Sequence, residues 1–326
     1  MRTHKGSRLL LAMLAAVMMM VVVAGCGGDD KSSSGGTDTT SSTSGGGASD
    51  MPGKGKPKVT IGTKDFTEEF ILGELYTKAL EAKGYTVNLK RNIGATEVVD
   101  KSLTSKQIDA YPEYTGVSLS VVAGNDKLTK SPEETQQLVK AFYEKRGQTV
   151  SDPTPFQDTD AIATTADFAE KNNLESIADL ANISGGFSVG ARPEFKDRFN
   201  GLRGMEKVYG VDNAEFKQLA LGLQYPSLDK GDVDSANVFS TDAQLASGKY
   251  KILEDPQGVF GFQNVFFVIN TPALEKLGGD DFMAVINSVN ELLSPDAITA
   301  MNAAVALDKK DPGDVAGAFL KANGLA

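Results

Sequence analysis

The chain has 326 residues, with 33 basic and 43 acidic side chains and a formal net charge of −10. This acidity disfavours contact with phosphate backbones, so nucleic acid is excluded as a partner. The chain has one cysteine, Cys26, and one histidine, His4. An intramolecular disulfide is therefore impossible, and sites that need several of these side chains are excluded.

An apolar run spans residues 9–24, follows a short basic segment and ends in small residues before Cys26. This pattern predicts a lipoprotein signal peptide over residues 1–25 and a lipid anchor on Cys26 that holds the chain at a membrane. The alternative is a transmembrane helix, but an apolar run of about 16 residues is shorter than the roughly 20 that span a bilayer. Removal of residues 1–25 takes away three basic and no acidic side chains and leaves a net charge of −13.

Residues 26–56 contain the lipidated cysteine and a stretch rich in glycine, serine, threonine and aspartate. Such a stretch has too few apolar side chains to offset the entropy cost of ordering, so it predicts a disordered linker. A coil of that length spans about 30 Å. We therefore expect a tether between the membrane and the folded part.

Folded sequence begins with a short apolar strand at residues 58–62 that ends in glycine and leads into a segment with helical spacing. The predicted elements are helix 67–83, strand 86–90, helix 97–105, strand 108–111 and helices 131–146 and 165–171. Alternation of strands and helices is typical of α/β proteins.

A second short strand that ends in glycine lies at residues 186–190 and resembles the strand at 58–62. A predicted helix follows from Glu194, and then a further unit that ends at 233–237. Two occurrences of a strand, a glycine and a helix predict two lobes of similar plan. An apolar strand follows at 264–269. The chain then continues into helices that we expect to return to the first lobe, at 273–277, 282–293, 295–305 and 315–323.

Once residues 1–25 are removed and Cys26 is lipidated, the chain has neither imidazole nor free thiol, which excludes serine–histidine, cysteine–histidine and zinc–histidine chemistry. We find no glycine-rich phosphate loop or dinucleotide fingerprint, and we expect no cofactor and no metal. A hydrolase or transferase remains as an alternative through carboxylate pairs, Asp109 with Glu113 or Asp232 with Asp234. A tethered, non-catalytic, two-lobed body is most simply a binding protein and not an enzyme.

Two motifs carry a family resemblance: GTKDFTEEFILGE at residues 62–74 and IDAYPEYTG at 108–116. They resemble the substrate-binding proteins of glycine betaine, choline and carnitine ABC transporters, which import osmoprotectants. Shorter matches follow at 240–242, 253–255 and 315–325. The resemblance covers residues 58–325.

The resemblance implies a type II periplasmic-binding-protein fold, with two α/β lobes, two crossover hinge segments and a ligand cleft between the lobes. The first lobe would be 57–158 plus 264–326, and the second 159–263. The protein would be a monomer outside the cytoplasmic membrane that delivers a small-molecule solute to the permease and ATPase subunits of an importer. The alternative is a sensing surface lipoprotein without transport.

The family's ligand site corresponds to six positions of this chain: Tyr114, Asp160, Phe239, Gln263, Lys64 and Arg198. Family members hold a quaternary ammonium in a box of tyrosines, since a methylated cation binds aromatic faces and cannot donate an N–H. Tyr114 matches that box. At the other three box positions the tyrosine is replaced, by Asp160, Phe239 and Gln263.

The altered box favours a cationic or zwitterionic ligand. An amino acid, a guanidino compound or a histidine-derived betaine would use Asp160 and Gln263 better than a bare trimethylammonium group would. Other interpretations remain open for single residues. Asp160 can be a helix N-cap, Phe239 a core residue and Arg198 a surface residue of its helix.

Overall fold

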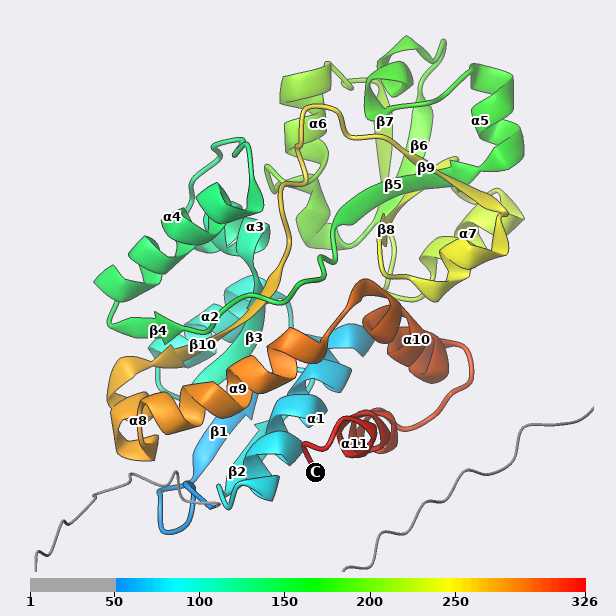
Figure 1. Ribbon diagram of the computed structural model, residues 1–326. Helices are drawn as coiled ribbons and strands as arrows, with labels where there is room; N and C mark the ends of the chain where they lie inside the picture. Colours follow the sequence, from blue (N-terminus) through cyan, green and yellow to red (C-terminus); the bar gives the residue numbers. More distant parts are fainter. Residues whose placement is uncertain (1–50) are drawn as a thin grey trace, which may run out of the picture. The chain divides into compact units, whose positions relative to one another are not determined.

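The computed structural model describes residues 51–326, so the predicted signal peptide, Cys26 and linker residues 26–50 lie outside the described residues. The described part contains two five-stranded mixed sheets, in the orders β2-β1-β3-β10-β4 and β7-β6-β8-β5-β9 (Figure 1). We call each sheet, with the helices that cover it, the first and the second lobe. The predicted two-lobed α/β architecture is confirmed. No described helix combines the length and the apolar character that crossing a membrane requires.

The first sheet combines strands from two distant parts of the sequence: β1 (Val59–Gly62), β2 (Val87–Lys90), β3 (Ala110–Tyr114), β4 (Gln148–Val150) and β10 (Val265–Asn270). Strand β1 runs parallel to β2 and β3, whereas β10 is antiparallel to both β3 and β4. The helices between these strands are α1 (Thr67–Ala82), α2 (Thr96–Thr104), the short α3 (Thr115–Val117) and α4 (Pro132–Lys145).

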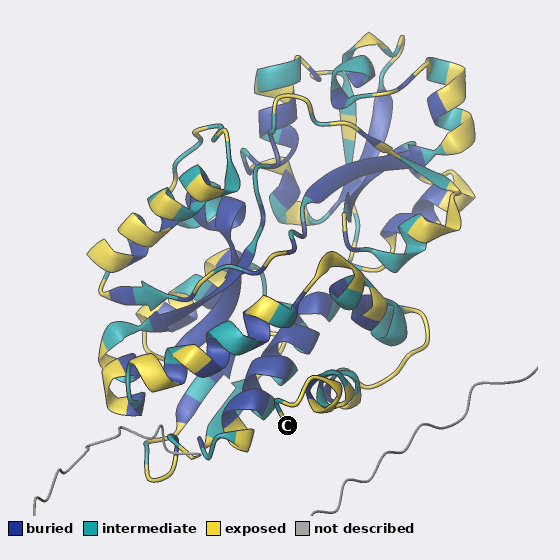
Figure 2. Cartoon of the chain, viewed as in Figure 1, coloured by how far each residue is buried: buried dark blue, intermediate teal, exposed yellow. Residues whose placement is uncertain are grey.

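Four helices follow β10: α8 (Thr271–Leu277), α9 (Asp280–Leu292), α10 (Pro295–Ala306) and α11 (Pro312–Ala322). Helices α9, α10 and α11 pack against α1 and share one buried apolar cluster with it. A second cluster, on the other face of the sheet, joins β3 and β10 to α2 and α4. Strand β3 is covered on both faces, and all five of its residues are buried (Figure 2).

The second sheet repeats the plan of the first: β5 (Asp160–Thr165), β6 (Phe187–Ala191), β7 (Ala214–Gln218), β8 (Ser235–Phe239) and β9 (Tyr250–Leu253). Strand β6 is parallel to β7 and β8, and β5 is antiparallel to β8 and β9. Helices α5 (Ala166–Asn172), α6 (Leu202–Tyr209) and α7 (Gln224–Lys230) belong to this lobe.

The structure differs from the sequence-based prediction where local pattern is weak. Strands β4, β5, β7 and β9 and helix α7 were not predicted, because segments of three to seven residues give little periodicity. Strand β5 is rich in alanine and threonine and is held by pairing with a neighbour along each edge. The helix expected from Glu194 begins at Leu202, because the segment Pro193–Lys196 forms an isolated 3₁₀ turn.

Two chain segments connect the lobes, from β4 to β5 and from β9 back to β10 (Figure 1). They lie side by side, because Gln157 and Asn264 form an antiparallel bridge. The Asp158 N–H donates to the Gln263 carbonyl oxygen at 3.1 Å, and the Gln263 N–H donates to Gln157 Oε1 at 3.1 Å. The crossover segments therefore form a short two-stranded hinge.

Candidate ligand-binding site

Lys64 lies just beyond the carboxyl end of β1, in the turn that leads into α1. Glycines allow close packing on both sides of this turn: a Cβ on Gly62 would come within 2.7 Å of Ile108, and one on Gly73 within 2.5 Å of Thr63. The buried ammonium of Lys64 donates to Glu113 on β3 and lies 3.8 Å from Glu69 Oε1. Burial raises the pKa of Glu69 to about 8, although the nearby Lys64 ammonium acts in the opposite direction.

Three aromatic rings gather beside Lys64, from both lobes. Phe66 stacks on Phe239 of the second lobe with ring centroids 5.4 Å apart and 14° between the planes. Tyr114 lies 6.1 Å from Phe66, and the Lys64 Nζ atom is 4.3 Å from the centre of the Tyr114 ring. A cation within about 6 Å of an aromatic face is attracted by the ring. The Tyr114 ring therefore attracts the Lys64 ammonium.

The second lobe contributes a charged pair at the ends of β5 and β6. Asp160 is the first residue of β5, not a helix N-cap, and its Oδ1 atom lies 3.6 Å from Arg192 Nη2. The same oxygen accepts a hydrogen bond from Asn237 Nδ2 at 2.9 Å. The Arg192 guanidinium lies 5.0 Å from the centre of the Phe239 ring. Asp160 therefore positions a cation over an aromatic face.

Arg198 reaches the first lobe from the second. Its Nε and Nη2 atoms donate to the two carboxylate oxygens of Glu97 on α2, at 3.1 and 2.7 Å. The arginine side chain is 8% exposed and that of Glu97 is 49% exposed. Arg198 is thus not a surface residue, and its ion pair connects the lobes.

These side chains surround a cavity of about 30 Å³, which we call the interlobe cavity. Five of the six predicted ligand residues line it, namely Lys64, Tyr114, Asp160, Arg198 and Phe239. The structure adds Phe66, Thr96, Val117, Asp158 and Arg192 to the lining. The space is too small for a solute of more than a few atoms, so the described arrangement is a closed one.

Gln263, the sixth predicted residue, does not line the interlobe cavity. Its Oε1 atom accepts from the Val117 N–H at 3.0 Å, and its Nε2 atom donates to the Phe260 carbonyl at 2.6 Å. The side chain is 1% exposed. In this arrangement Gln263 holds the crossover segment against α3. The three aromatic rings beside the interlobe cavity are those of Tyr114, Phe239 and Phe66.

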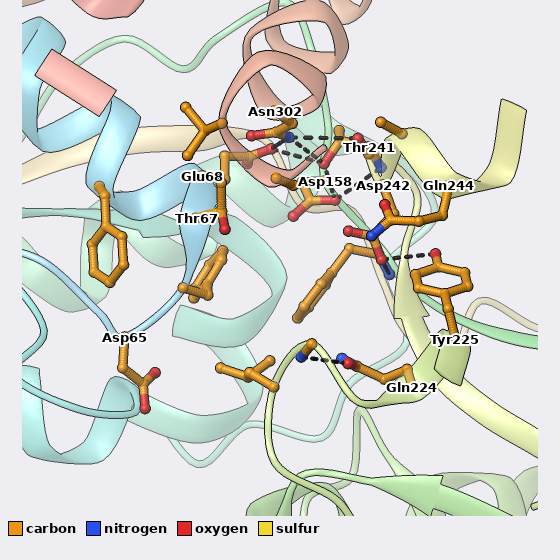
Figure 3. A pocket seen from close by; sticks show the side chains of 18 of the residues that line it. Asp65, Thr67, Glu68, Asp158, Gln224, Tyr225, Thr241, Asp242, Gln244 and Asn302 are labelled. Carbon is orange, nitrogen blue, oxygen red and sulfur yellow. Dashed lines mark hydrogen bonds between the residues drawn. The ribbon is translucent and has the colours of Figure 1, made fainter. Parts of the chain in front are cut away.

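A buried hydrogen-bond network links the lobes beside the interlobe cavity. Glu68 on α1 accepts from the Tyr114 hydroxyl at 2.8 Å, from Thr241 Oγ1 at 2.7 Å and from Asn302 Nδ2 at 2.8 Å. Thr241 Oγ1 also lies 2.8 Å from Asp158 Oδ1. We call Glu68, Thr241, Asp158 and Asn302 the interlobe network (Figure 3).

Two carboxyl groups of the interlobe network lie around one hydroxyl. The Thr241 hydroxyl is within hydrogen-bond distance of both Glu68 and Asp158. Burial raises the pKa of Glu68, and burial followed by repulsion from Glu68 raises the pKa of Asp158 well above its usual value.

A second cavity, of about 360 Å³, lies on the other side of the stacked rings; we call it the outer cavity. Phe66, Phe239 and Asp158 line both cavities and separate them. Figure 3 shows the interlobe network on one side of the outer cavity and Tyr225 on the other, with its hydroxyl donating to Asp242 at 2.9 Å.

The sequence analysis missed Glu68, Phe66, Arg192 and Thr241 as site residues. Three of them lie inside motifs quoted for the family resemblance, at 62–74 and 240–242. Glu68 could have been found from its place on a helix face that is otherwise apolar, because a buried carboxylate needs hydrogen-bond partners. Arg192 had no local signal.

The carboxylate pairs considered for catalysis do not form. Asp109 precedes β3 and Glu113 lies within it, about 13 Å further along an extended strand. Asp109 Oδ2 accepts from the Thr60 N–H at 2.8 Å, and Asp234 Oδ2 accepts from the N–H and the hydroxyl of Ser188, both at 2.7 Å. Asp109 and Asp234 therefore hold strands together.

Comparisons with known proteins agree with this geometry. Residues 57–322 match the family model described as the substrate binding domain of ABC-type glycine betaine transport systems. "Glycine betaine-binding protein YehZ" of Escherichia coli is 29% identical over 289 residues, which cover 85% of this chain and 94% of that protein. A "glycine-betaine-binding protein" of Pseudomonas aeruginosa is 30% identical over 276 residues, covering 81% of this chain and 88% of that one.

Solved structures show the same fold. The crystal structure of a "glycine betaine/carnitine/choline ABC transporter" protein superposes with a TM-score of 0.66 at 24% identity, covering 82% of this chain and 99% of that one. Apo YehZ of Escherichia coli gives a TM-score of 0.59 at 29% identity, also covering 82% of this chain and 99% of that one. The chain belongs to the family of substrate-binding domains of ABC-type glycine betaine transport systems, which are extracytoplasmic solute-binding proteins and not enzymes.

Proposed function

We propose that this protein is a lipid-anchored receptor that captures a compact zwitterion with a quaternary or similarly substituted ammonium group in the interlobe cavity. It delivers this solute to the permease and ATPase subunits of an ABC importer. The observation that carries the proposal is the pair of cations on aromatic faces, Lys64 on Tyr114 and Arg192 on Phe239. The rings that would hold a ligand cation hold the protein's own cations in the described arrangement.

The cationic end of the ligand would replace one of these internal cations. A methylammonium group is large, weakly hydrated and unable to donate a hydrogen bond, so it gains from ring faces, at about 0.5–2 kcal/mol for each good contact. Asp160 adds a negative charge next to Phe239 and attracts the same end. Phe66 closes the third side.

The carboxylate end would face the cations that line the cavity, Lys64, Arg192 and Arg198. Each of these cations has a carboxylate partner, Glu113, Asp160 and Glu97 in turn, with which a ligand carboxylate would share it. Glycine betaine and carnitine carry such a carboxylate, whereas choline does not.

A histidine-derived betaine or an amino acid is the second candidate ligand. "Ergothioneine transport permease/ergothioneine binding protein EgtU" of Helicobacter pylori is 28% identical over 272 residues, covering 83% of this chain and 48% of that protein. Asp160 at a box position supports a ligand with N–H groups, which a carboxylate accepts and a tyrosine face does not. Sensing of such a solute without transport is the alternative to import.

The anchor and the division into domains belong to the same proposal. Residues 1–25 would be removed as a signal peptide, Cys26 would carry the lipid, and the linker would extend to residue 56. The first lobe would be 57–158 plus 264–326, and the second 159–263. The strands of each sheet come from these segments, which supports the division. The receptor would act as a monomer.

A thermal-shift panel with glycine betaine, carnitine, ergothioneine, choline and arginine tests the ligand class. A ligand at one hundred times its Kd stabilises the protein by about 2.7 kcal/mol, which gives a clear rise in Tm. We expect larger shifts from the zwitterions than from choline. The absence of a shift with all five compounds would refute the proposed ligand class.

Two further measurements test the location and the partner. Labelled fatty acid should enter the wild-type chain and not Cys26→Ser. Cells that produce the receptor with its neighbouring permease and ATPase should accumulate the solute that gives the largest shift. Uptake that is unchanged when the receptor is deleted would favour the sensing alternative.

A further inference from the structure

A third cavity, of about 710 Å³, lies at the opposite end of the first sheet from the interlobe cavity. It opens where β1, β3 and β4 begin and β10 ends, in the lower left part of Figure 1 around α8 and β4. Lys58, Lys106, Arg146 and Lys276 line it, with Asp109 as the one acidic residue of the lining. We call it the basic cavity.

The three lysines of the basic cavity carry charge that no described residue balances. Among the ion pairs and hydrogen bonds of residues 51–326, none involves the side chain of Lys58, Lys106 or Lys276. The chain has ten more acidic than basic side chains, so partners for a lysine are plentiful elsewhere on it. Three unpaired ammonium groups around one cavity form a local positive field in an acidic protein.

Arg146, the fourth cation of the basic cavity, is balanced by Asp100. Arg146 donates to both carboxylate oxygens of Asp100, at 2.9 and 3.0 Å, and its guanidinium lies 5.0 Å from the centre of the Phe142 ring. Asp109, the one acidic residue of the lining, accepts from the Thr60 N–H at 2.8 Å. The three lysines against Asp109 leave an excess of positive charge in the cavity.

The size and the lining of the basic cavity indicate what kind of ligand it could hold. A volume of about 710 Å³ is in the range of small-molecule sites and exceeds what a bare inorganic anion fills. Part of the wall is apolar, formed by Pro57, Pro272, Ala273 and Leu277. Gln148 in the same wall is 3% exposed, and its Oε1 atom accepts no hydrogen bond from a described residue. A hydroxyl group of a ligand would supply the donor that this oxygen lacks.

We propose that the basic cavity is a second binding site, for an organic phosphate that carries a hydroxyl group. Lysine ammonium groups bind phosphate oxygens as compact point charges. The hydroxyl would pair with the Gln148 amide, and the carbon skeleton would lie on the apolar wall. The site is at the opposite edge of the sheet from Lys64 and Tyr114, so it can be occupied together with the interlobe cavity.

Two sources supply this chemistry, a soluble phosphate ester and the headgroup of an anionic phospholipid such as phosphatidylglycerol. Calorimetry of the full chain with sn-glycerol 3-phosphate and with inorganic phosphate tests the first source. Sedimentation with phosphatidylglycerol or phosphatidylcholine vesicles tests the second. The test variant is Lys106→Gln with Lys276→Gln. The matched control is Lys140→Gln with Lys321→Gln, which changes the net charge equally at two exposed lysines outside the cavity.

We expect binding of glycerol phosphate or of phosphatidylglycerol vesicles, weakened roughly tenfold or more in the test variant and unchanged in the control. Binding of the soluble ester identifies a metabolite site, and binding of vesicles alone identifies a headgroup site. Equal weakening in both double variants would mean that only net charge matters and would overturn the proposal. No binding of any probe would overturn it as well. Binding of the interlobe ligand should be the same in all variants.

Discussion

The interlobe cavity and the basic cavity stand at opposite ends of one sheet and use positive charge in opposite ways. In the interlobe cavity each cation has a carboxylate partner: Lys64 has Glu113, Arg192 has Asp160 and Arg198 has Glu97. In the basic cavity three lysines have none among the described residues. Paired, buried charges hold a geometry, whereas unpaired, exposed charges are free to attract an ion.

The difference teaches how binding and movement are connected. A ligand in the interlobe cavity must exchange partners with internal ion pairs, and the pair of Arg198 with Glu97 joins the two lobes. We therefore expect binding there to be coupled to opening and closing of the lobes. A ligand in the basic cavity displaces only water and touches one lobe, so no such coupling is expected.

The largest expected effect contrasts Lys64→Met with Lys276→Met. Removing the Lys64 ammonium leaves Glu113 buried without a counter-charge, which costs about 3–5 kcal/mol of folding stability. Lys276 is exposed and unpaired, so its replacement should change stability by no more than about 0.5 kcal/mol. Urea denaturation of both variants measures the difference. Similar stability losses would remove the distinction between the two cavities.

The next effect is a pH dependence of folding stability, which arises from Glu69 beside the interlobe cavity. Burial raises the pKa of Glu69 to about 8, above its value in the unfolded chain. The stability gained from neutral Glu69 is full below about pH 4.5 and is lost as the pH rises through 8, by up to about 1.4 kcal/mol per pH unit. Burial shifts Glu68 and Asp158 in the same direction.

Melting curves from acidic to mildly alkaline pH measure this dependence. Glu69→Gln keeps the side chain neutral at every pH, so its Tm should vary less with pH than that of the wild type. Glu144→Gln, at an exposed position on α4, serves as the control and should retain the wild-type slope. A Glu69→Gln curve parallel to the wild-type curve would assign the pH dependence to other groups.

A smaller effect is expected for Asp160→Asn. This change removes the charge that faces Arg192 and keeps the side-chain volume. Affinity for a cationic ligand should fall about tenfold, which corresponds to about 1.4 kcal/mol. The loss should be larger for choline than for a zwitterion, whose carboxylate gains the released Arg192. Titration calorimetry compares it with Asp167→Asn, at an exposed position on α5, and equal affinities would exclude Asp160 from the site.

The smallest effect concerns the ring pair between the lobes. Phe66→Leu keeps an apolar side chain but loses the stacking on Phe239, worth about 0.5–1.5 kcal/mol. Ligand affinity should fall by the corresponding factor of about three to ten. Phe142→Leu removes a ring pair with Tyr143 inside α4, away from the cavity, and should leave ligand affinity unchanged. Calorimetry measures the ligand affinity of both variants. It distinguishes loss of the Phe66–Phe239 stacking from loss of aromatic packing elsewhere in the fold.

The two local motifs contain Lys64 and Tyr114, which the structure brings together; their role in ligand binding stays a prediction. Lys64 follows β1 and Tyr114 ends β3, and adjacent parallel strands bring their carboxyl ends together. The contacts of Glu68 with Thr241 and of Arg198 with Glu97 join residues 173 and 101 positions apart. No local pattern predicts such contacts. The direction of the Gln263 side chain was also beyond prediction, because the crossover pairing decides it.

The insertion of β10 between β3 and β4 has a consequence for the order of folding. The second lobe is one continuous segment, and its five strands are complete once β9 has been made. The first sheet lacks its fourth strand, and α1 lacks its covering helices, until the last quarter of the chain arrives. We therefore expect the earliest described residues to complete their packing last, with apolar surface exposed meanwhile. A chain truncated before residue 265 should contain a protease-resistant second lobe and a protease-sensitive first one.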